Sequence, residues 1–328
     1  MSVIFSRAPL RVSLGGGGTD LPSYYREYGG FVVAAAIDKY VYMLIHTEFQ
    51  RRWRMKYSDT EEVDDVSDIR HPILRETLLR RWRGNPLEIA SVADVPAGTG
   101  MGSSGAYTVC LIKGLAHARR ISTTPGMLAE AACEIEIDVL GDPVGKQDQY
   151  VAAHGGICAY TYNSDGTVEV EPLELDHSTL IRLRNQMLLF YVGGSRSASA
   201  ILNDQRVRSE AADPVMLENL HHTKELGARS ADTLRQGDLD GYAQAMHEHW
   251  EHKRERSPGM SNERIDQLYA LARRSGVIGG KLLGAGGGGF LLLYTHRPED
   301  TRQAMTMSGV NELLFDFEFG GVYSSEYT

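Results

Sequence analysis

The sequence predicts a mixed α+β fold, and three observations lead to that class. Apolar segments of strand length, rich in β-branched and aromatic residues, alternate with longer segments of helical periodicity. Glycine-rich turns separate several of these segments. The chain has 328 residues, of which 42% are hydrophobic, so it is long enough for a large core and for about two domains.

Most of the expected strands lie in the first half of the chain. They cover residues 3–14, 31–46, 54–57, 87–92 and 156–162. Between the last two, the apolar periodicity predicts helices over about 103–118 and about 125–140. The turn at 163–166 predicts a hairpin, and the acidic stretch 169–176 that follows is the expected boundary between two domains, 1–176 and 177–328.

The second half begins with an apolar strand at 187–192 and then becomes helical. Helices are expected over about 214–235, 239–254 and 262–274. Strands at 277–283 and 290–295 flank a run of glycines, and 315–319 is expected to close the chain as a strand.

Charge and cysteine content narrow the classes of partner. Lys and Arg number 34 against 43 Asp and Glu, a net charge of −9 that disfavours nonspecific binding to nucleic acid or to an anionic membrane. The three cysteines lie far apart without a C-x-x-C pair, and no apolar run approaches the roughly 20 residues of a membrane span. We therefore expect a cytoplasmic protein whose partners are small molecules, without nucleic-acid or membrane partners; a homodimer stays open.

Glycine is concentrated in three clusters, at 15–18, 98–105 and 284–289. Such runs are typical of backbone that passes close to a ligand, whereas a simple tight turn needs one or two glycines. The middle cluster follows a strand and opens an apolar helix, so its N–H groups predict a site for an anion such as phosphate. It is neither a Walker A loop nor a dinucleotide fingerprint. Ser103 and Ser104 at the helix start are either caps or ligands of a magnesium ion.

One carboxylate stands out within the expected helix 125–140. On a helical wheel Glu136 falls in the apolar arc, beside Ala132 and Cys133, where an unpaired charge is costly. Either a hidden arginine or backbone donor satisfies it, or it ligates a metal. Asp148 follows a short turn after the same helix. Two carboxylates beside a phosphate-binding helix suggest Mg²⁺ and phosphoryl transfer.

Together these segments resemble the GHMP kinase superfamily, which includes galactokinase, homoserine kinase and mevalonate kinase. Its three motifs are similar to R-A-P-L-R-V-S-L-G-G-G-G-T-D at 7–20, P-A-G-T-G-M-G-S-S-G-A at 96–106 and K-L-L-G-A-G-G-G-G-F at 281–290. All three occur in order and span essentially the whole chain. The resemblance implies the two-domain GHMP kinase fold, with a ribosomal protein S5 domain 2-like first half and a ferredoxin-like second half of helices and sheet.

Within that superfamily the chain is most similar to the D-glycero-D-manno-heptose 7-phosphate kinases. The first motif, G-K-Q-D-Q-Y at 145–150 and G-S-R-S-A-S at 194–199 carry this similarity. Galactokinases differ because their first motif ends in E-H-T-D, where this chain has G-G-T-D. Mevalonate kinases have lysine at the position of Arg11, and their base aligns less well with Asp148.

The resemblance implies an activity, two cofactors and a role for each matching residue. With ATP and Mg²⁺, the γ-phosphoryl group would pass to the anomeric hydroxyl of heptose 7-phosphate, giving the 1,7-bisphosphate for nucleotide-sugar synthesis. Asp148 would take the hydroxyl proton or orient the nucleophile, and Arg11 would stabilise it and the transferring phosphoryl group. Glu136 and Ser104 would hold Mg²⁺, with Ser103 as the alternative hydroxyl. The ATP-binding set would be Pro96, Gly98, Gly100, Gly102, Ser103, Ser104 and Gly105.

The sugar phosphate is expected on the other side of the same site. Its binding set would be Gly17, Gly18, Thr19, Asp20, Ser195, Arg196, Ser197, Gly286 and Gly287, with Asp20 on the sugar hydroxyls. Arg196 suits the second phosphate because its guanidinium is a fork, although a serine-rich helix start with a solvated arginine explains the segment equally well. A kinase for another sugar, such as fucose or an unphosphorylated heptose, and a non-catalytic sugar or nucleotide sensor are the alternative functions.

Three further features are given structural interpretations. His247, His249 and His252 lack the H-E-x-x-H spacing of a zinc-protease helix. The cluster Arg51, Arg52 and Arg54 is expected on a solvated face. Aromatic residues around Tyr57 are expected in the core, with an adenine pocket as the alternative.

Overall fold

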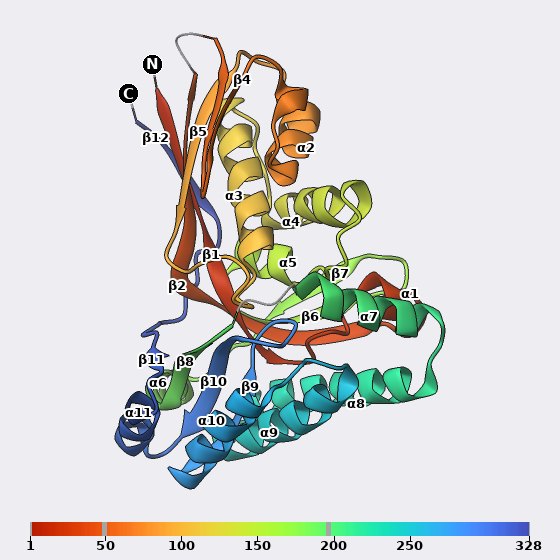
Figure 1. Ribbon diagram of the computed structural model, residues 1–328, viewed down its shortest axis with the longest axis vertical. Coiled ribbons are helices and arrows are strands. Elements are labelled where there is room, and N and C mark those ends of the chain that lie inside the picture. Colours follow the sequence, from red (N-terminus) through yellow and green to blue (C-terminus); the bar gives the residue numbers. More distant parts are fainter. Residues whose placement is uncertain (1, 48–50, 195–197, 328) are drawn as a thin grey trace.

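The computed structural model describes residues 2–47, 51–194 and 198–327, and these residues build two β-sheets with helices around them (Figure 1). The larger sheet has eight strands and the smaller sheet four. The α+β class is confirmed. No helix in the described ranges is long and apolar enough to cross a membrane.

The larger sheet is organised around two long neighbouring strands, β1 and β2. Its order is β12-β1-β2-β5-β3-β4, and β6 pairs with β2 and with β7. One end of β2 pairs with β5 and the other with β6, so this strand links both parts of the sheet. The strands are β1 (Val3–Gly15), β2 (Gly30–Thr47), β3 (Trp53–Lys56), β4 (Thr60–Val63), β5 (Leu87–Ala93), β6 (Ile157–Tyr162), β7 (Val168–Pro172) and β12 (Tyr323–Tyr327).

The expected last strand at 315–319 is wrong. Phe317 makes a single bridge to Ile37, and the chain then turns through Gly320 and Gly321. The closing strand is β12, which pairs antiparallel with β1. Because β1 and β12 lie at opposite ends of the chain, their pairing depends on the tertiary fold. Local sequence patterns therefore do not locate the terminal strand.

Three helical segments cover one face of the larger sheet. They are α3 (Ser103–Ala118), α4 (Pro125–Cys133) and α5 (Gln147–His154), and α3 contacts β1, β2 and both other helices (Figure 1). The α-helix expected to reach residue 140 instead ends at Cys133 and continues as a π-helix, η2 (Glu134–Val139). Single π turns inside helices often mark functional sites.

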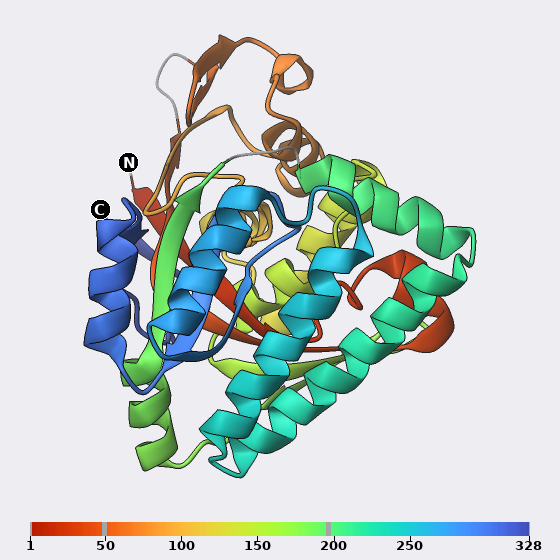
Figure 2. The same ribbon diagram turned by 60° about the horizontal axis from the view of Figure 1, so that its bottom comes forward.

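The smaller sheet lies at the opposite end of the molecule. Its order is β11-β8-β10-β9, with β8 (Met187–Gly193), β9 (Val277–Leu282), β10 (Gly289–Thr295) and β11 (Asn311–Glu312). Helices α8 (Pro214–Arg235) and α9 (Leu239–Arg256) run side by side, as Figure 2 shows, and α9 packs against β9 of the smaller sheet. Because α8 contacts β1 and β2, this helix pair connects the two sheets.

Helix α9 lies unusually close to β9. A Cβ atom on Gly279 would stand 1.7 Å from the carbonyl oxygen of Ala243 in α9, so a larger residue would force the two elements apart. The remaining helices are α1 (Pro22–Tyr28), α2 (Pro72–Arg81), α6 (His177–Gln186), α7 (Ala198–Glu210), α10 (Glu263–Arg274), α11 (Pro298–Met307) and the short 3₁₀ segment η1 (Val66–Asp68).

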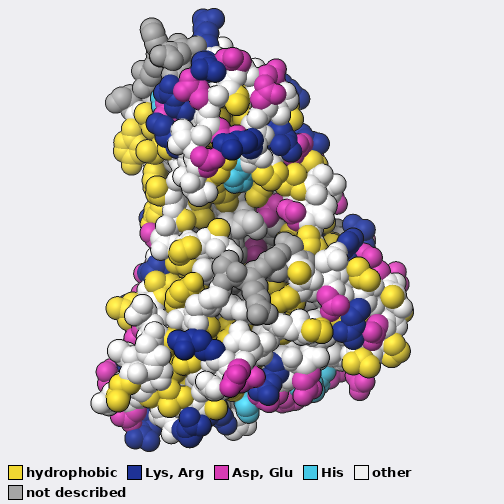
Figure 3. Space-filling view, viewed as in Figure 1, with side chains coloured by type: hydrophobic (Ala, Val, Ile, Leu, Met, Phe, Trp, Pro, Cys, Tyr) yellow, Lys and Arg dark blue, Asp and Glu magenta, His cyan; other side chains and the backbone are white. Residues whose placement is uncertain are grey.

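The surface carries charges of both signs. On the face shown in Figure 3, basic and acidic side chains are intermixed, and the face is hollowed near its middle.

Strands β1 to β7 precede residue 176 and β8 to β11 follow it, while β12 returns to the larger sheet.

Candidate active site

A cavity of about 980 Å³ brings the three glycine clusters together. Gly17 and Gly18 line it from the first cluster, residues of the 98–104 turn from the second, and Gly284 from the third. The second and third clusters touch, since a Cβ on Gly284 would lie 2.4 Å from the Cα of Gly100. Segments more than 180 residues apart in sequence therefore form one wall.

The second glycine cluster presents the start of α3 to this cavity. Gly102 precedes the helix with φ of 76°, a left-handed conformation that favours glycine, and no side chain caps the first N–H groups. The lining residues from this cluster include Pro96, Gly98, Gly100, Gly102, Ser103 and Ser104. An uncapped helix N-terminus at a cavity wall is suited to an anion.

Gly105 has a different place from the rest of its cluster. A Cβ at this position would lie 2.7 Å from the Cβ of Asp148 and 2.9 Å from the backbone nitrogen of Gln149. Its lack of a side chain lets α3 and α5 pack closely. Gly105 therefore brings Asp148 to the mouth of the glycine turn.

Arg11 and Asp148 form the central ion pair of the cavity. Arg11 donates from Nε to Oδ1 of Asp148 at 2.8 Å, and a second guanidinium nitrogen lies 2.6 Å from the same oxygen. The third nitrogen donates to the carbonyl of Gly100 at 2.5 Å. Arg11 is thus fixed between the carboxylate and the glycine turn, while the Asp148 side chain stays 25% exposed.

Glu136 is completely buried near Ser104 and Thr108, in the first turns of α3. Gln149 donates to its Oε1 at 3.0 Å, but its Oε2 has no hydrogen-bond partner. Burial, and less strongly the charge of Asp148, raise the pKa of Glu136, the neighbouring side chains of Gln149, Ser104 and Thr108 lower it, and the net value is about 7. An arginine was one of the partners expected for a buried acid at this position. Among the described residues, no arginine pairs with Glu136.

The donor set around Glu136 fits a magnesium ion. Carboxylate and hydroxyl oxygens are the ligands Mg²⁺ prefers, and the carboxyl group of Glu136 lies near the side chain of Ser104, which is exposed to the cavity. The hydroxyl of Ser103 is buried without a partner. Because it is exposed to the cavity, Ser104 is better placed than Ser103 to contact a bound ion.

Asp20 is held on the opposite rim by backbone donors. Gly18 donates to its Oδ1 at 3.0 Å and Gln147 to its Oδ2 at 3.2 Å. Burial raises the pKa of Asp20, and the charge of Asp148 raises it further. Both carboxylates line the cavity together with Arg11.

Two family models match the chain. The model described as GHMP kinases N terminal domain matches residues 72–156, and GHMP kinases C terminal matches residues 230–309. A D-glycero-alpha-D-manno-heptose 7-phosphate kinase from Campylobacter jejuni is 30% identical over 97% of this chain and 97% of its own. The chain belongs to the GHMP kinases. It is a sugar kinase of that family, with ATP as phosphoryl donor.

Other similar proteins include sugar kinases and mevalonate kinases. The bifunctional fucokinase/GDP-fucose pyrophosphorylase of Arabidopsis thaliana is 25% identical over 90% of this chain, which spans 30% of that longer protein. The crystal structure of a D-glycero-D-manno-heptose 1-phosphate kinase from Bacteroides thetaiotaomicron superimposes with a TM-score of 0.81 over 99% of both chains, at 23% identity. The GHMP kinase fold expected from the sequence is confirmed.

Some residues of the kinase's expected substrate set have other places. Thr19 is fully buried, and its hydroxyl lies within hydrogen-bond distance of the carbonyls of Gly16 and Phe31, so it stabilises the first turn and does not line the cavity. In the third cluster Gly284 and Ala285 line the cavity, whereas Gly286 and Gly287 pack against Met260. None of these three residues lines the cavity, and their expected contact with substrate stays a prediction.

Ser195, Arg196 and Ser197 lie outside the described residues. Their expected role in binding the sugar's own phosphate therefore stays a prediction.

A basic group on the far wall of the kinase cavity was not expected from the sequence. Its members are His249, Lys253, Arg256 and Lys281. A lysine within the otherwise apolar strand 277–283 was the available signal. The three histidines near 250 have different surroundings: His247 contacts the hydroxyl of Tyr269 at 2.8 Å, the ring of His252 lies tilted against that of His222, and His249 lines the cavity.

Proposed function

We propose that this GHMP kinase transfers the γ-phosphoryl group of ATP to the anomeric hydroxyl of D-glycero-D-manno-heptose 7-phosphate, giving the 1,7-bisphosphate. The observation that carries the chemistry is the Arg11–Asp148 pair at the mouth of the glycine turn, beside a buried acid with a free oxygen. The substrate class is supported by the full-length similarity to a heptose 7-phosphate kinase.

The triphosphate binds along the glycine turn and the start of α3. N–H groups of the 98–104 turn donate to the phosphate oxygens. The base would bind at the other end of the cavity, which is lined by Tyr57, His71 and Tyr107. Their rings are already in contact, with centroids 4.8 Å and 5.0 Å apart, and aromatic faces suit a purine. Tyr57 is therefore assigned to the nucleotide rather than to the core.

Glu136 and Ser104 would hold Mg²⁺. Bound there, the ion would neutralise negative charge that develops on the phosphoryl group during transfer. The unpartnered Oε2 of Glu136 supports this assignment, because a buried carboxylate oxygen otherwise leaves its desolvation uncompensated.

Asp148 acts on the acceptor hydroxyl. Arg11 contacts Oδ1 of Asp148, which leaves the second carboxylate oxygen for the sugar. The anomeric oxygen attacks the γ-phosphorus, its proton passes to Asp148, and the bond between the γ-phosphorus and the bridging oxygen breaks to release ADP. Arg11 stabilises the negative charge on the transferring group. Asp20 accepts hydrogen bonds from sugar hydroxyls on the opposite rim.

A panel of acceptors tests the proposal. The kinase is incubated with ATP and Mg²⁺ and with heptose 7-phosphate, unphosphorylated heptose or fucose, and the products are identified by phosphorus NMR. The proposal expects a new anomeric phosphate with heptose 7-phosphate and much slower turnover of the others. Preferred turnover of fucose would favour the function named for the Arabidopsis relative, and nucleotide binding without any turnover would favour a sensor.

A further inference from the structure

The basic group on the far wall comes from two elements that pack tightly together. His249, Lys253 and Arg256 occur at i, i+4 and i+7 on α9, so they share one face of the helix. Lys281 lies on β9, two residues after Gly279, the glycine that lets α9 approach this strand. Side chains at 279 and 281 point to the same side of the sheet, which brings Lys281 to His249.

All four side chains are buried, and each is at most 7% exposed. Lys253 donates to the carbonyls of Leu282 at 2.9 Å and Gly284 at 2.5 Å. Lys281 has a single long contact, 3.5 Å from its Nζ to Nδ1 of His249. In the described part of the chain, no carboxylate pairs with either lysine.

His249 adds an unsatisfied polar atom to this wall. Its Nε2 is buried without a hydrogen-bond partner. When Lys281 donates to Nδ1, the ring proton must sit on Nε2, which then becomes a donor that lacks an acceptor. The same wall therefore holds a hydrogen-bond donor without an acceptor, at His249, and two lysines without a carboxylate partner, Lys253 and Lys281.

The chain treats another buried lysine differently. Lys146 is also 7% exposed, but it donates to both carboxylate oxygens of Glu130, at 2.8 and 3.1 Å, and to the carbonyl of Gly166. Lys146, a buried lysine with a structural role, is thus paired with a carboxylate. The lack of one at Lys253 and Lys281 points to a ligand that supplies the charge.

Both lysines of this wall are destabilised in their charged form. Burial, with added repulsion from Arg256 and Arg11, lowers the pKa of Lys253 to about 7. Burial also lowers the pKa of Lys281 well below its ordinary value, with added repulsion from Lys253, Arg11 and Arg256. The charged neighbours of both lysines are cations, so an anion with more than one charge would stabilise the group.

We propose that Lys281, Lys253 and Nε2 of His249 form a subsite for a phosphate dianion in the acceptor half of the cavity. The inference rests on the proposed function, since a sugar kinase that uses a sugar phosphate handles two such groups. Either the sugar's own phosphate or the transferring γ-phosphoryl group supplies the dianion. Arg256 adds charge but is already bound to Asn219, Thr223 and the carbonyl of Gly17, so it positions the wall.

The test uses inorganic phosphate as the probe and the full chain with its nucleotide site filled. Phosphate is titrated by calorimetry into the Mg·ADP complex and into the complex with Mg and a non-hydrolysable ATP analogue. The variant Lys281→Met removes the ammonium group at similar size. Lys56→Met is the matched control, because Lys56 is exposed and paired with Glu88 on the outside of the molecule.

The proposal expects phosphate to bind the Mg·ADP complex and Lys281→Met to weaken that binding at least tenfold, with no change for Lys56→Met. Binding that persists beside the ATP analogue identifies the sugar's own phosphate as the occupant. Binding that the analogue's γ-phosphate abolishes identifies the transferring group. Lys253→Met is measured in parallel, so that the result does not depend on the folding of one variant.

Two results would overturn the subsite. One is phosphate affinity in both lysine variants equal to that of the unmodified kinase, and the other is the absence of phosphate binding to either nucleotide complex. Because these titrations need no sugar, they are independent of the acceptor panel. Lysine-dependent phosphate binding together with no turnover of heptose 7-phosphate would sustain the subsite and reject the proposed substrate.

Discussion

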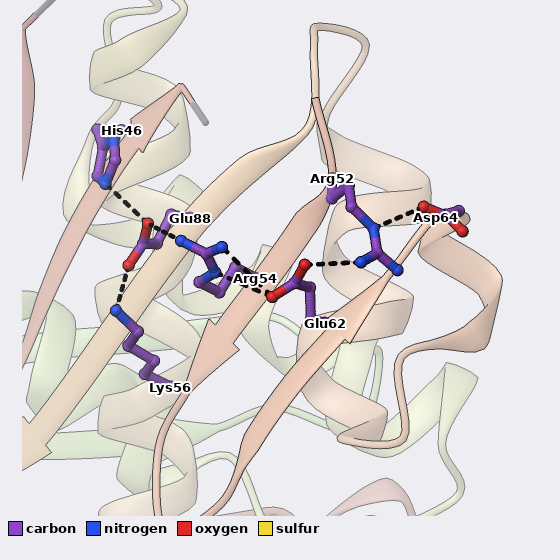
Figure 4. Close-up of polar contacts among 7 residues, drawn as sticks. All are labelled: His46, Arg52, Arg54, Lys56, Glu62, Asp64 and Glu88. Carbon is purple, nitrogen blue, oxygen red and sulfur yellow. Dashed lines mark hydrogen bonds and ion pairs between the residues drawn. The ribbon is translucent and has the colours of Figure 1, made fainter. Parts of the chain in front are cut away.

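The outside of the larger sheet and the far wall of the cavity use the same kinds of basic residue in opposite ways. On the outer face of β3, β4 and β5, Arg52, Arg54 and Lys56 are interleaved with Glu62, Asp64 and Glu88, and every cation contacts a carboxylate (Figure 4). On the cavity wall the basic residues contact carbonyls and a histidine ring, and their charged neighbours are mostly cations.

We interpret the exposed, paired charges of the outer face as serving solubility, and the buried charges of the cavity wall as serving to bind a ligand. Exposed ion pairs contribute about 0–1 kcal/mol each, because water screens them. A buried cation without a partner loses its hydration and gains little in return. Substitutions should therefore have large effects inside the cavity and small effects on the outer network.

The largest effect is expected at Asp148. Asp148→Asn removes the acceptor for the hydroxyl proton and should lower kcat by roughly 10²–10⁴-fold, while nucleotide affinity stays close to normal because the glycine turn is unchanged. Steady-state kinetics and nucleotide titration measure the two quantities separately. Asp138→Asn, at an exposed acid on the π-helix, is the control. An unaltered kcat in Asp148→Asn would remove this residue from the chemistry.

The second effect concerns stability and its pH dependence. Lys281→Met should stabilise the ligand-free kinase by about 1–4 kcal/mol, because it removes a buried charge without an ion-pair partner. The native pKa of Lys281 is lowered, so the native state releases this proton before the unfolded chain does. The penalty is thus full below the native pKa and declines as pH rises toward the ordinary lysine value of 10.5.

Urea unfolding at pH 7 and pH 10 measures this change. The groups that face Lys281 are His249, Lys253, Arg256 and Arg11, and all of them are present in both proteins, so the difference between variant and unmodified kinase isolates Lys281. The gain in free energy of unfolding should be larger at pH 7. A gain that grows with pH, or a loss at neutral pH, would mean that Lys281 is already satisfied.

The third effect concerns Mg²⁺. Glu136→Gln keeps the contact with Gln149 available but removes the negative charge, so the Mg²⁺ concentration needed for nucleotide binding should rise on the order of tenfold. Glu134→Gln is the matched control, since Glu134 lies on the same π-helix, is exposed and pairs with Arg81. Equal Mg²⁺ dependence in both variants would exclude Glu136 as a ligand.

The two regions also differ in how far the sequence predicts them. The burial of Glu136 follows from local helical periodicity, and α3 was expected at its observed bounds, because both depend on residues near in sequence. The meeting of Lys281 with His249 depends on α9 packing against β9, which no local pattern encodes. The same holds for β12, whose pairing with β1 joins the two ends of the chain.

The smallest effect is expected on the outer network, and it tests the comparison from its other side. Arg52 is 40% exposed and contacts Glu62 and Asp64. Arg52→Ala should change the free energy of unfolding by less than about 1 kcal/mol and leave kcat and both KM values unaltered, as measured by urea unfolding and steady-state kinetics. Added salt should reduce even this difference, because it screens exposed pairs. A drop in activity would show that a change in β3 and β4 alters the nucleotide end of the cavity through Tyr57. The paired and unpaired cations would then no longer differ in their effect on function.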